Sequence, residues 1–156
     1  MSLDYYIISK MPVEHKHTGI YIRENGETKE LSKEEAEKKF DMPVEEYTST
    51  DSELLHVNIT HNLAKMAKQC EIDGISLYDV LWHPDEVLIN GEPSISYCQN
   101  LFILYRELKA HREKYEKFNP PNGWGSYDGL LKALRKIIKC LIIDNDIDDL
   151  KIEASI

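Results

Sequence analysis

The segment His56–Asn62 holds the densest group of polar side chains that could do chemistry: two histidines, two asparagines and a threonine. If the segment starts as a strand, alternation places His56, Asn58 and Thr60 together on the face opposite the core. Thr60 then caps a helix that starts at His61, and the free backbone N–H groups there attract anions or polar ligands. We therefore expect polar groups to converge at this turn.

Imidazole and amide groups at a helix N-terminus can form hydrogen bonds with a small polar ligand, orient a water molecule or bind a metal. A metal site needs three or four ligands, and the nearest carboxylates, Asp51 and Glu53, lie in an irregular segment. We therefore predict a hydrogen-bonding site with no metal and no cofactor. The alternative interpretation is structural, with each asparagine amide tying down the backbone of a neighbouring loop.

Two loops that each carry a tryptophan are candidates to flank this turn. Trp82 ends a short helix, and Trp124 lies in the Asn-Gly-Trp-Gly segment at residues 122–125. Tryptophans at such borders fill the core or form the wall of a cleft, because they offer apolar area and one N–H group. We predict that Trp124 is buried between the helix that ends near Phe118 and the helix that starts at Ser126. The predicted ligand-binding residues are Asn58, Thr60, His61, Asn62, His56, Trp82, Asn122 and Trp124.

Three functional hypotheses follow, because no G-x-S-x-G, H-E-x-x-H, P-loop, C-x-x-C or G-x-G-x-x-G pattern specifies a reaction. The first is a non-enzymatic accessory protein that binds a small polar ligand or a protein partner. The second is a small hydrolase or nucleotide-processing enzyme with His61 as general base and Asn58 or Asn62 orienting the reacting group. The third is an acidic interaction protein that uses its basic helix faces or the acidic run at residues 144–149. No catalytic residue is assigned.

Composition narrows the class of protein. A chain of 156 residues, 42% hydrophobic and 30% charged, is typical of one globular domain. A formal net charge of −9 argues against general nucleic-acid binding, which requires a basic surface. The 3 cysteines are widely spaced, and neither a signal peptide nor an apolar run of about 18 residues is present. We therefore expect a soluble cytoplasmic protein with reduced thiols and no membrane association, and the oligomeric state stays open.

The pattern of elements predicts strands at both ends of the chain. Residues 4–9, 18–23 and 28–31 have strand character, and Asn25-Gly26 is a strong hairpin signal. A capping box at residues 32–35 opens a charged helix, and residues 41–53 have the composition of a loop. Apolar spacing predicts further helices over residues 61–71, 76–82, 95–118 and from 126 to about 141, followed by a strand over 150–156.

These elements predict the α+β class. We expect a small antiparallel sheet made from the N-terminal strands, the hairpin and the C-terminal strand, with about four helices packed on one face. The two terminal strands are expected to pair. The prediction is a single domain over residues 1–156, with a variable polar insertion around residues 32–53.

Four short motifs in the last two thirds of the chain resemble those of a family of small uncharacterised proteins from phages, prophages and bacterial genomes. The motifs are Asn-Ile-Thr-His-Asn-Leu at 58–63, Leu-Trp-His-Pro at 81–84, Asn-Pro at 119–120 and Asn-Gly-Trp-Gly at 122–125. The resemblance covers residues 56–156 and implies a short N-terminal strand and hairpin, a final strand and a phage or mobile-element origin. It implies no activity and no catalytic residue.

Overall fold

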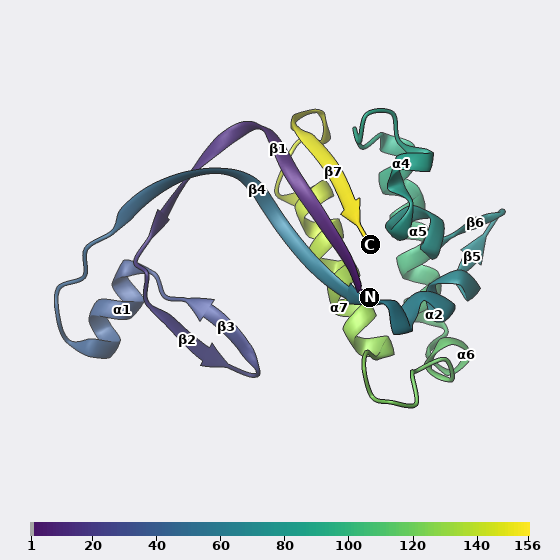
Figure 1. The fold of residues 1–156 in the computed structure, drawn as a ribbon, viewed down its shortest axis with the longest axis horizontal. Coiled ribbons are helices and arrows are strands. Elements are labelled where there is room, and N and C mark those ends of the chain that lie inside the picture. Colours follow the sequence, from purple (N-terminus) through teal and green to yellow (C-terminus); the bar gives the residue numbers. More distant parts are fainter. Residues whose placement is uncertain (1) are drawn as a thin grey trace. The chain divides into compact units, whose positions relative to one another are not determined.

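The computed structural model describes residues 2–156, apart from the side chains of Val13 and Asp51. The chain forms two compact units, of which one contains the chain up to Met11 together with Glu53–Ile156, and the other contains Pro12–Ser52. Helices and small antiparallel sheets make up the molecule, which confirms the predicted α+β class (Figure 1).

A three-stranded sheet is the centre of the larger unit. Strand β1 (Ser2–His17) lies between β4 (Tyr47–Thr60) and β7 (Leu150–Ser155). Strands β1 and β7 are antiparallel, with Ile7 opposite Ile152. The predicted pairing of the first and last strands is therefore confirmed.

Strand alternation gives this sheet one apolar and one polar face, because successive side chains point to opposite sides. Helices cover the apolar face, and Figure 1 shows α7 behind the sheet with α5 beside it. These helices are α2 (Ala64–Gln69), α3 (Leu77–Trp82), α4 (Pro84–Val87), α5 (Ile95–Ala110), α6 (Arg112–Glu116) and α7 (Tyr127–Ile138). The buried apolar residues of these strands are Leu3, Tyr5, Ile7, Val57, Ile59, Leu150 and Ile152.

The predicted helix over residues 95–118 is interrupted at His111. The backbone of His111 is not helical, with φ −125° and ψ 54°, and it separates α5 from α6. Its ring atom Nδ1 lies 3.1 Å from the carbonyl oxygen of Glu107. The side chain therefore replaces the backbone donor that a continuous helix would offer to this carbonyl group.

The predicted helix over residues 61–71 is also shorter than expected. A single 3-10 turn at His61–Leu63 leads into α2, which ends at Gln69. The chain then forms a small hairpin of β5 (Glu71–Ile72) and β6 (Ile75–Ser76), which the sequence analysis missed. Its turn residues Asp73 and Gly74 both have positive φ, and an Asp-Gly pair is a good signal for such a turn.

The smaller unit contains the predicted hairpin and the predicted capped helix. Strands β2 (Tyr21–Glu24) and β3 (Glu27–Glu30) are joined by Asn25 and Gly26, whose positive φ angles of 52° and 78° fit a type I′ turn. Helix α1 (Lys33–Phe40) follows and has the complete capping box. Leu31, Ala36 and Val44 form the core of this unit, with Ile20 and Ile22 packed against it.

The predicted loop over residues 41–53 is wrong in its second half, because β4 already begins at Tyr47. Pro43 gives a loop signal for the residues around it only. The aromatic and β-branched side chains from Tyr47 to Thr50 favour an extended backbone instead.

Two buried tyrosines connect the sheet to the helices through a chain of hydrogen bonds. The hydroxyl group of Tyr97 on α5 donates to the carbonyl oxygen of Val80 on α3 at 2.8 Å. The hydroxyl oxygen of Tyr5 on β1 lies 2.8 Å from that of Tyr97, to which it donates. Burial raises the pKa of both phenols, so both keep their protons. Strand β1 is thereby fixed to two helices at once.

The two tyrosines are expected to differ in their contribution to stability. Tyr97→Phe should lower the free energy of unfolding by about 1–3 kcal/mol, because it leaves the Val80 carbonyl group and the Tyr5 hydroxyl group without partners. Tyr5→Phe removes one donor only and should cost about 1 kcal/mol. Urea denaturation measures both values. The double variant should cost no more than Tyr97→Phe alone, and fully additive costs would contradict the chain of hydrogen bonds.

Candidate functional site

The predicted residues His56 and Asn58 lie on the polar face of the sheet, where their side chains bind β1. Atom Nε2 of His56 lies 2.8 Å from Oδ1 of Asp4. Atom Nδ2 of Asn58 donates to the same oxygen at 2.8 Å and to the hydroxyl oxygen of Ser2 at 2.9 Å. The His56 ring stacks on Tyr6 with a centroid distance of 4.5 Å and an interplanar angle of 8°. Both side chains thus make cross-strand contacts that stabilise the sheet.

Asp4 is the common acceptor in this cluster, and the sequence analysis missed it. Hydrogen bonds from Asn58 and then His56 stabilise the charged carboxylate, so the pKa of Asp4 is lowered. The carboxylate is thereby kept ionised. Asp4 lies 52 residues from His56 in the chain. No local sequence pattern therefore indicates that the two strands place these residues side by side.

The predicted cap at Thr60 is confirmed. Its hydroxyl oxygen accepts from the backbone N–H of Asn62 at 3.4 Å and from the Asn62 side chain at 3.2 Å. His61, between them, is exposed. Gly125 packs against this turn so closely that a Cβ atom there would lie 2.5 Å from the Thr60 methyl group and 3.0 Å from Cγ of Leu63. The loop at residues 119–125 therefore flanks the turn, as predicted.

Trp124 is 72% exposed, so its predicted burial is wrong. Two tyrosines fill the interior at this end of the helix pair instead, because Tyr115 and Tyr127 are both almost fully buried. The backbone N–H group of Tyr127 also donates a hydrogen bond to Asn119 Oδ1 at 2.7 Å. Asn122 Oδ1 accepts from the backbone N–H of Trp124 at 2.9 Å, which fixes the loop while the indole ring faces outward.

Trp82, in contrast, is buried and stacks on Tyr78 at a centroid distance of 5.2 Å. It lines a cavity of about 670 Å³ whose other walls come from residues 83–85, residues 90–91 and the end of the chain from Ile152. Among the described residues, its Nε1 has no hydrogen-bond acceptor. Because His56, Asn58 and His61 do not line this cavity, the predicted site residues do not form one shared cleft there.

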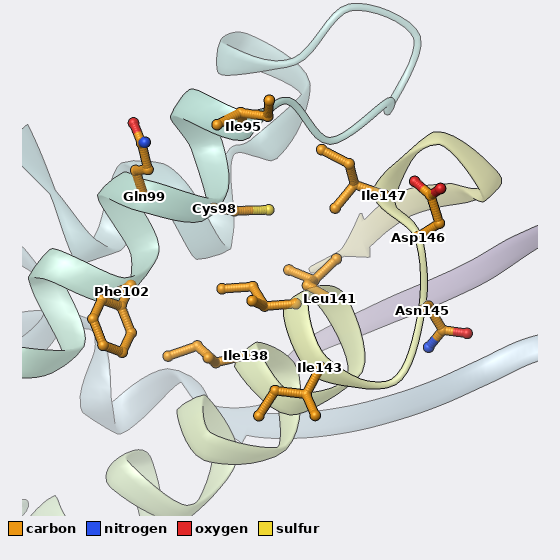
Figure 2. A pocket seen from close by; sticks show the side chains of 11 residues that line it. Ile95, Cys98, Gln99, Phe102, Ile138, Leu141, Ile143, Asn145, Asp146 and Ile147 are labelled. Atoms are coloured by element: carbon orange, nitrogen blue, oxygen red, sulfur yellow. The ribbon is translucent and has the colours of Figure 1, made fainter.

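A second cavity, of about 520 Å³, is an apolar groove that the sequence analysis did not predict. One wall is the start of α5, and the other is the end of α7 with the chain that follows it. Figure 2 shows side chains from both walls directed toward the space between them. The lining residues are Ile95, Cys98, Gln99, Phe102, Ile138, Leu141, Ile142, Ile143, Asn145, Asp146 and Ile147.

The second wall depends on a π-helical turn at Lys139–Ile143, directly after α7. Leu141 in this turn is buried, whereas Ile142 and Ile143 are exposed beside the groove. The Asn145 side chain donates to the carbonyl oxygen of Cys140 at 2.9 Å and holds the following segment against the turn. Single π-helical turns of this kind are frequent at functional sites.

The cysteine thiols do not supply a nucleophile. Burial raises the pKa of Cys98 in the groove and of Cys140 beside it, and it raises the pKa of Cys70 to about 11. The thiols therefore stay protonated at neutral pH and act as small apolar groups.

No three histidine, cysteine, aspartate or glutamate side chains among the described residues lie close enough together to hold a metal ion. None of the helices in this part of the chain has the length and apolar character needed to cross a membrane.

Comparison with known proteins finds no family model, no curated protein and no solved structure that matches this chain. The resemblance to phage and prophage proteins therefore depends on the short motifs alone.

The Asp4 cluster predicts a specific pH dependence of stability. The folded-state pKa of Asp4 is lowered, so its contribution is fully present above the unfolded value of about 3.9 and is lost as the pH falls through the folded value. The variant Asp4→Asn lacks this carboxylate, so the loss of stability that Asp4 causes at acidic pH should disappear. Chemical denaturation at a series of pH values between neutral and strongly acidic conditions measures the difference, and parallel curves for both proteins would contradict the assignment.

The two tryptophans should respond in opposite ways to truncation. Trp82→Ala is expected to cost about 3–5 kcal/mol, because it removes a large buried ring, whereas Trp124→Ala should change the stability by less than about 0.5 kcal/mol. Thermal denaturation distinguishes them. Acrylamide should quench the fluorescence of Trp82→Phe, which retains Trp124, more strongly than that of Trp124→Phe, and the reverse order would show that Trp124 is buried.

Proposed function

We propose that this chain is a non-catalytic binding protein that holds an amphipathic helix of a protein partner in the groove between α5 and the end of α7. The observation that carries this proposal is that apolar surface continues from the groove onto exposed side chains around it. Ile143 is 72% exposed, and Ile95, Phe102 and Ile142 are also large apolar side chains in contact with solvent.

Apolar side chains that are exposed to water cost free energy, and contiguous apolar patches on soluble domains mark interaction sites. Here the patch is continuous, because these side chains line one cavity rather than being scattered over the surface. The polar groups of the lining are few and come from Gln99, Asn145 and Asp146. A partner would therefore gain affinity mainly by burying apolar side chains in the groove.

The exposed apolar side chains at the rim of the groove favour a helix as the bound element. A volume of about 520 Å³ lies within the range of ligand pockets, about 300–1,000 Å³. A small molecule could fill the cavity, but it would leave the exposed isoleucines at the rim in water. An amphipathic helix places apolar side chains at regular spacing along a groove of this kind and covers the rim as well.

This proposal corresponds to the protein-partner branch of the first sequence-based hypothesis. The motif resemblance supports an accessory role in a phage or mobile element. The polar cluster of Asp4, His56 and Asn58 has a structural role in this account, since its side chains bind one another across the strands.

The proposal predicts that one exposed isoleucine in the groove contributes strongly to binding. A fluorescently labelled, uncharged amphipathic helical peptide with a leucine face serves as the probe, and fluorescence anisotropy measures its affinity. Ile143→Ser should weaken binding by about 10- to 100-fold, because a buried isoleucine contributes about 1.5–3 kcal/mol.

Ile103→Ser is the matched control, since Ile103 is 47% exposed on α5 but does not line the groove. This variant should bind the peptide like the wild type. Both substitutions replace exposed side chains, so circular dichroism and melting temperature should stay unchanged. Equal losses of affinity in the two variants, or no binding to the wild type, would contradict the proposal.

A further inference from the structure

We infer that the helix bound in the groove is basic, with lysine or arginine side chains along one edge of its apolar face. The inference rests on the proposed function and adds the charge of the partner to it. It follows from the unequal charge of the two groove walls.

The wall after α7 is acidic. Residues 144–149 contain Asp144, Asp146, Asp148 and Asp149, all exposed, and no basic residue. Asp146 lines the groove itself and caps the short helix Ile147–Asp149 by accepting the backbone N–H of Asp148 at 3.0 Å. The carboxylate of Asp146 is therefore held at the rim of the groove by a defined turn.

The neighbouring Lys139 offsets one of these four negative charges. Its Nζ lies 4.0 Å from Oδ2 of Asp144, and both side chains are at least half exposed. The other three carboxylates of the segment add to the negative potential at the rim.

The opposite wall carries no charge of its own near these carboxylates. Residues 93–105, which include the start of α5, contain no aspartate, glutamate, lysine or arginine. The first cation along α5 is Arg106, whose guanidinium group lies 6.0 Å from the centre of the Phe102 ring. A bound helix would therefore meet negative charge along one edge and a neutral surface along the other.

This arrangement favours a cationic partner and disfavours an anionic one. Charges of one sign beside a binding surface speed the association of an oppositely charged partner, and like charges reject the wrong one. Because the aspartates are exposed, the effect should weaken as salt shortens the screening distance to about 8 Å at physiological ionic strength. The isoleucines would provide most of the affinity, and the aspartates the selectivity.

Three helical peptides with the same leucine face test the inference, with lysine, glutamine or glutamate at the flanking positions. Fluorescence anisotropy at low and at physiological salt measures their affinities for the wild type. We expect the lysine peptide to bind at least fivefold more tightly than the glutamine peptide at low salt, and the glutamate peptide to bind more weakly than both. The preference should decrease at the higher salt concentration.

The variant Asp148→Asn/Asp149→Asn removes two charges of the acidic segment beside the groove and leaves the capping carboxylate of Asp146 in place. It should lose most of the preference for lysine and keep its affinity for the glutamine peptide. Asp85→Asn/Glu86→Gln is the matched control, because it makes the same change in net charge at exposed residues of α4, outside the groove. This control should keep the wild-type preference.

The possible outcomes separate the inference from the proposed function. If all three peptides bind equally, or if the α4 control loses the preference as well, the inference is wrong while binding in the groove stands. If no peptide binds, the proposed function fails. If the wild type sediments as a dimer and Ile143→Ser as a monomer, a second copy of the chain occupies the groove, and this result also overturns the inference.

Discussion

The chain of hydrogen bonds from Tyr5 through Tyr97 to the carbonyl oxygen of Val80 is the constraint on which the rest of the larger unit depends. Each of these polar groups is removed from water, so each is satisfied only while β1, α3 and α5 keep their relative positions. Cys98, the next residue along α5, lines the apolar groove. The same bonds that fix the sheet to the helices therefore also fix one wall of the groove.

The polar face of the sheet and the apolar groove differ in how many of their side chains find partners within the molecule. On the polar face of the sheet, Asp4 accepts hydrogen bonds from His56 and Asn58, and the His56 ring stacks on Tyr6. In the groove, apolar side chains such as Ile143 remain exposed to water, which costs free energy. Because binding energy comes mainly from surface that a partner can bury, the groove is the stronger candidate for a functional site.

The sequence predicted the features that depend on neighbouring residues. The Asn25-Gly26 turn, the capping box at Ser32 and the cap at Thr60 all follow from local backbone chemistry. The exposure of Trp124 could not be predicted, because other aromatic rings from two helices compete for the same interior space. The groove was missed because the π-helical turn decides that Ile143 is exposed, and nothing in a run of apolar residues indicates such a turn.

The most direct test of the central claim is a map of backbone amide chemical shifts during titration with the lysine-flanked amphipathic peptide. The account predicts that the largest changes fall on residues 95–102 and 138–149, the two walls of the groove. Amides around Asp4, His56 and Asn58 should change little. Changes centred on the polar face of the sheet, with the groove unaffected, would show that the partner binds the surface that this account treats as structural.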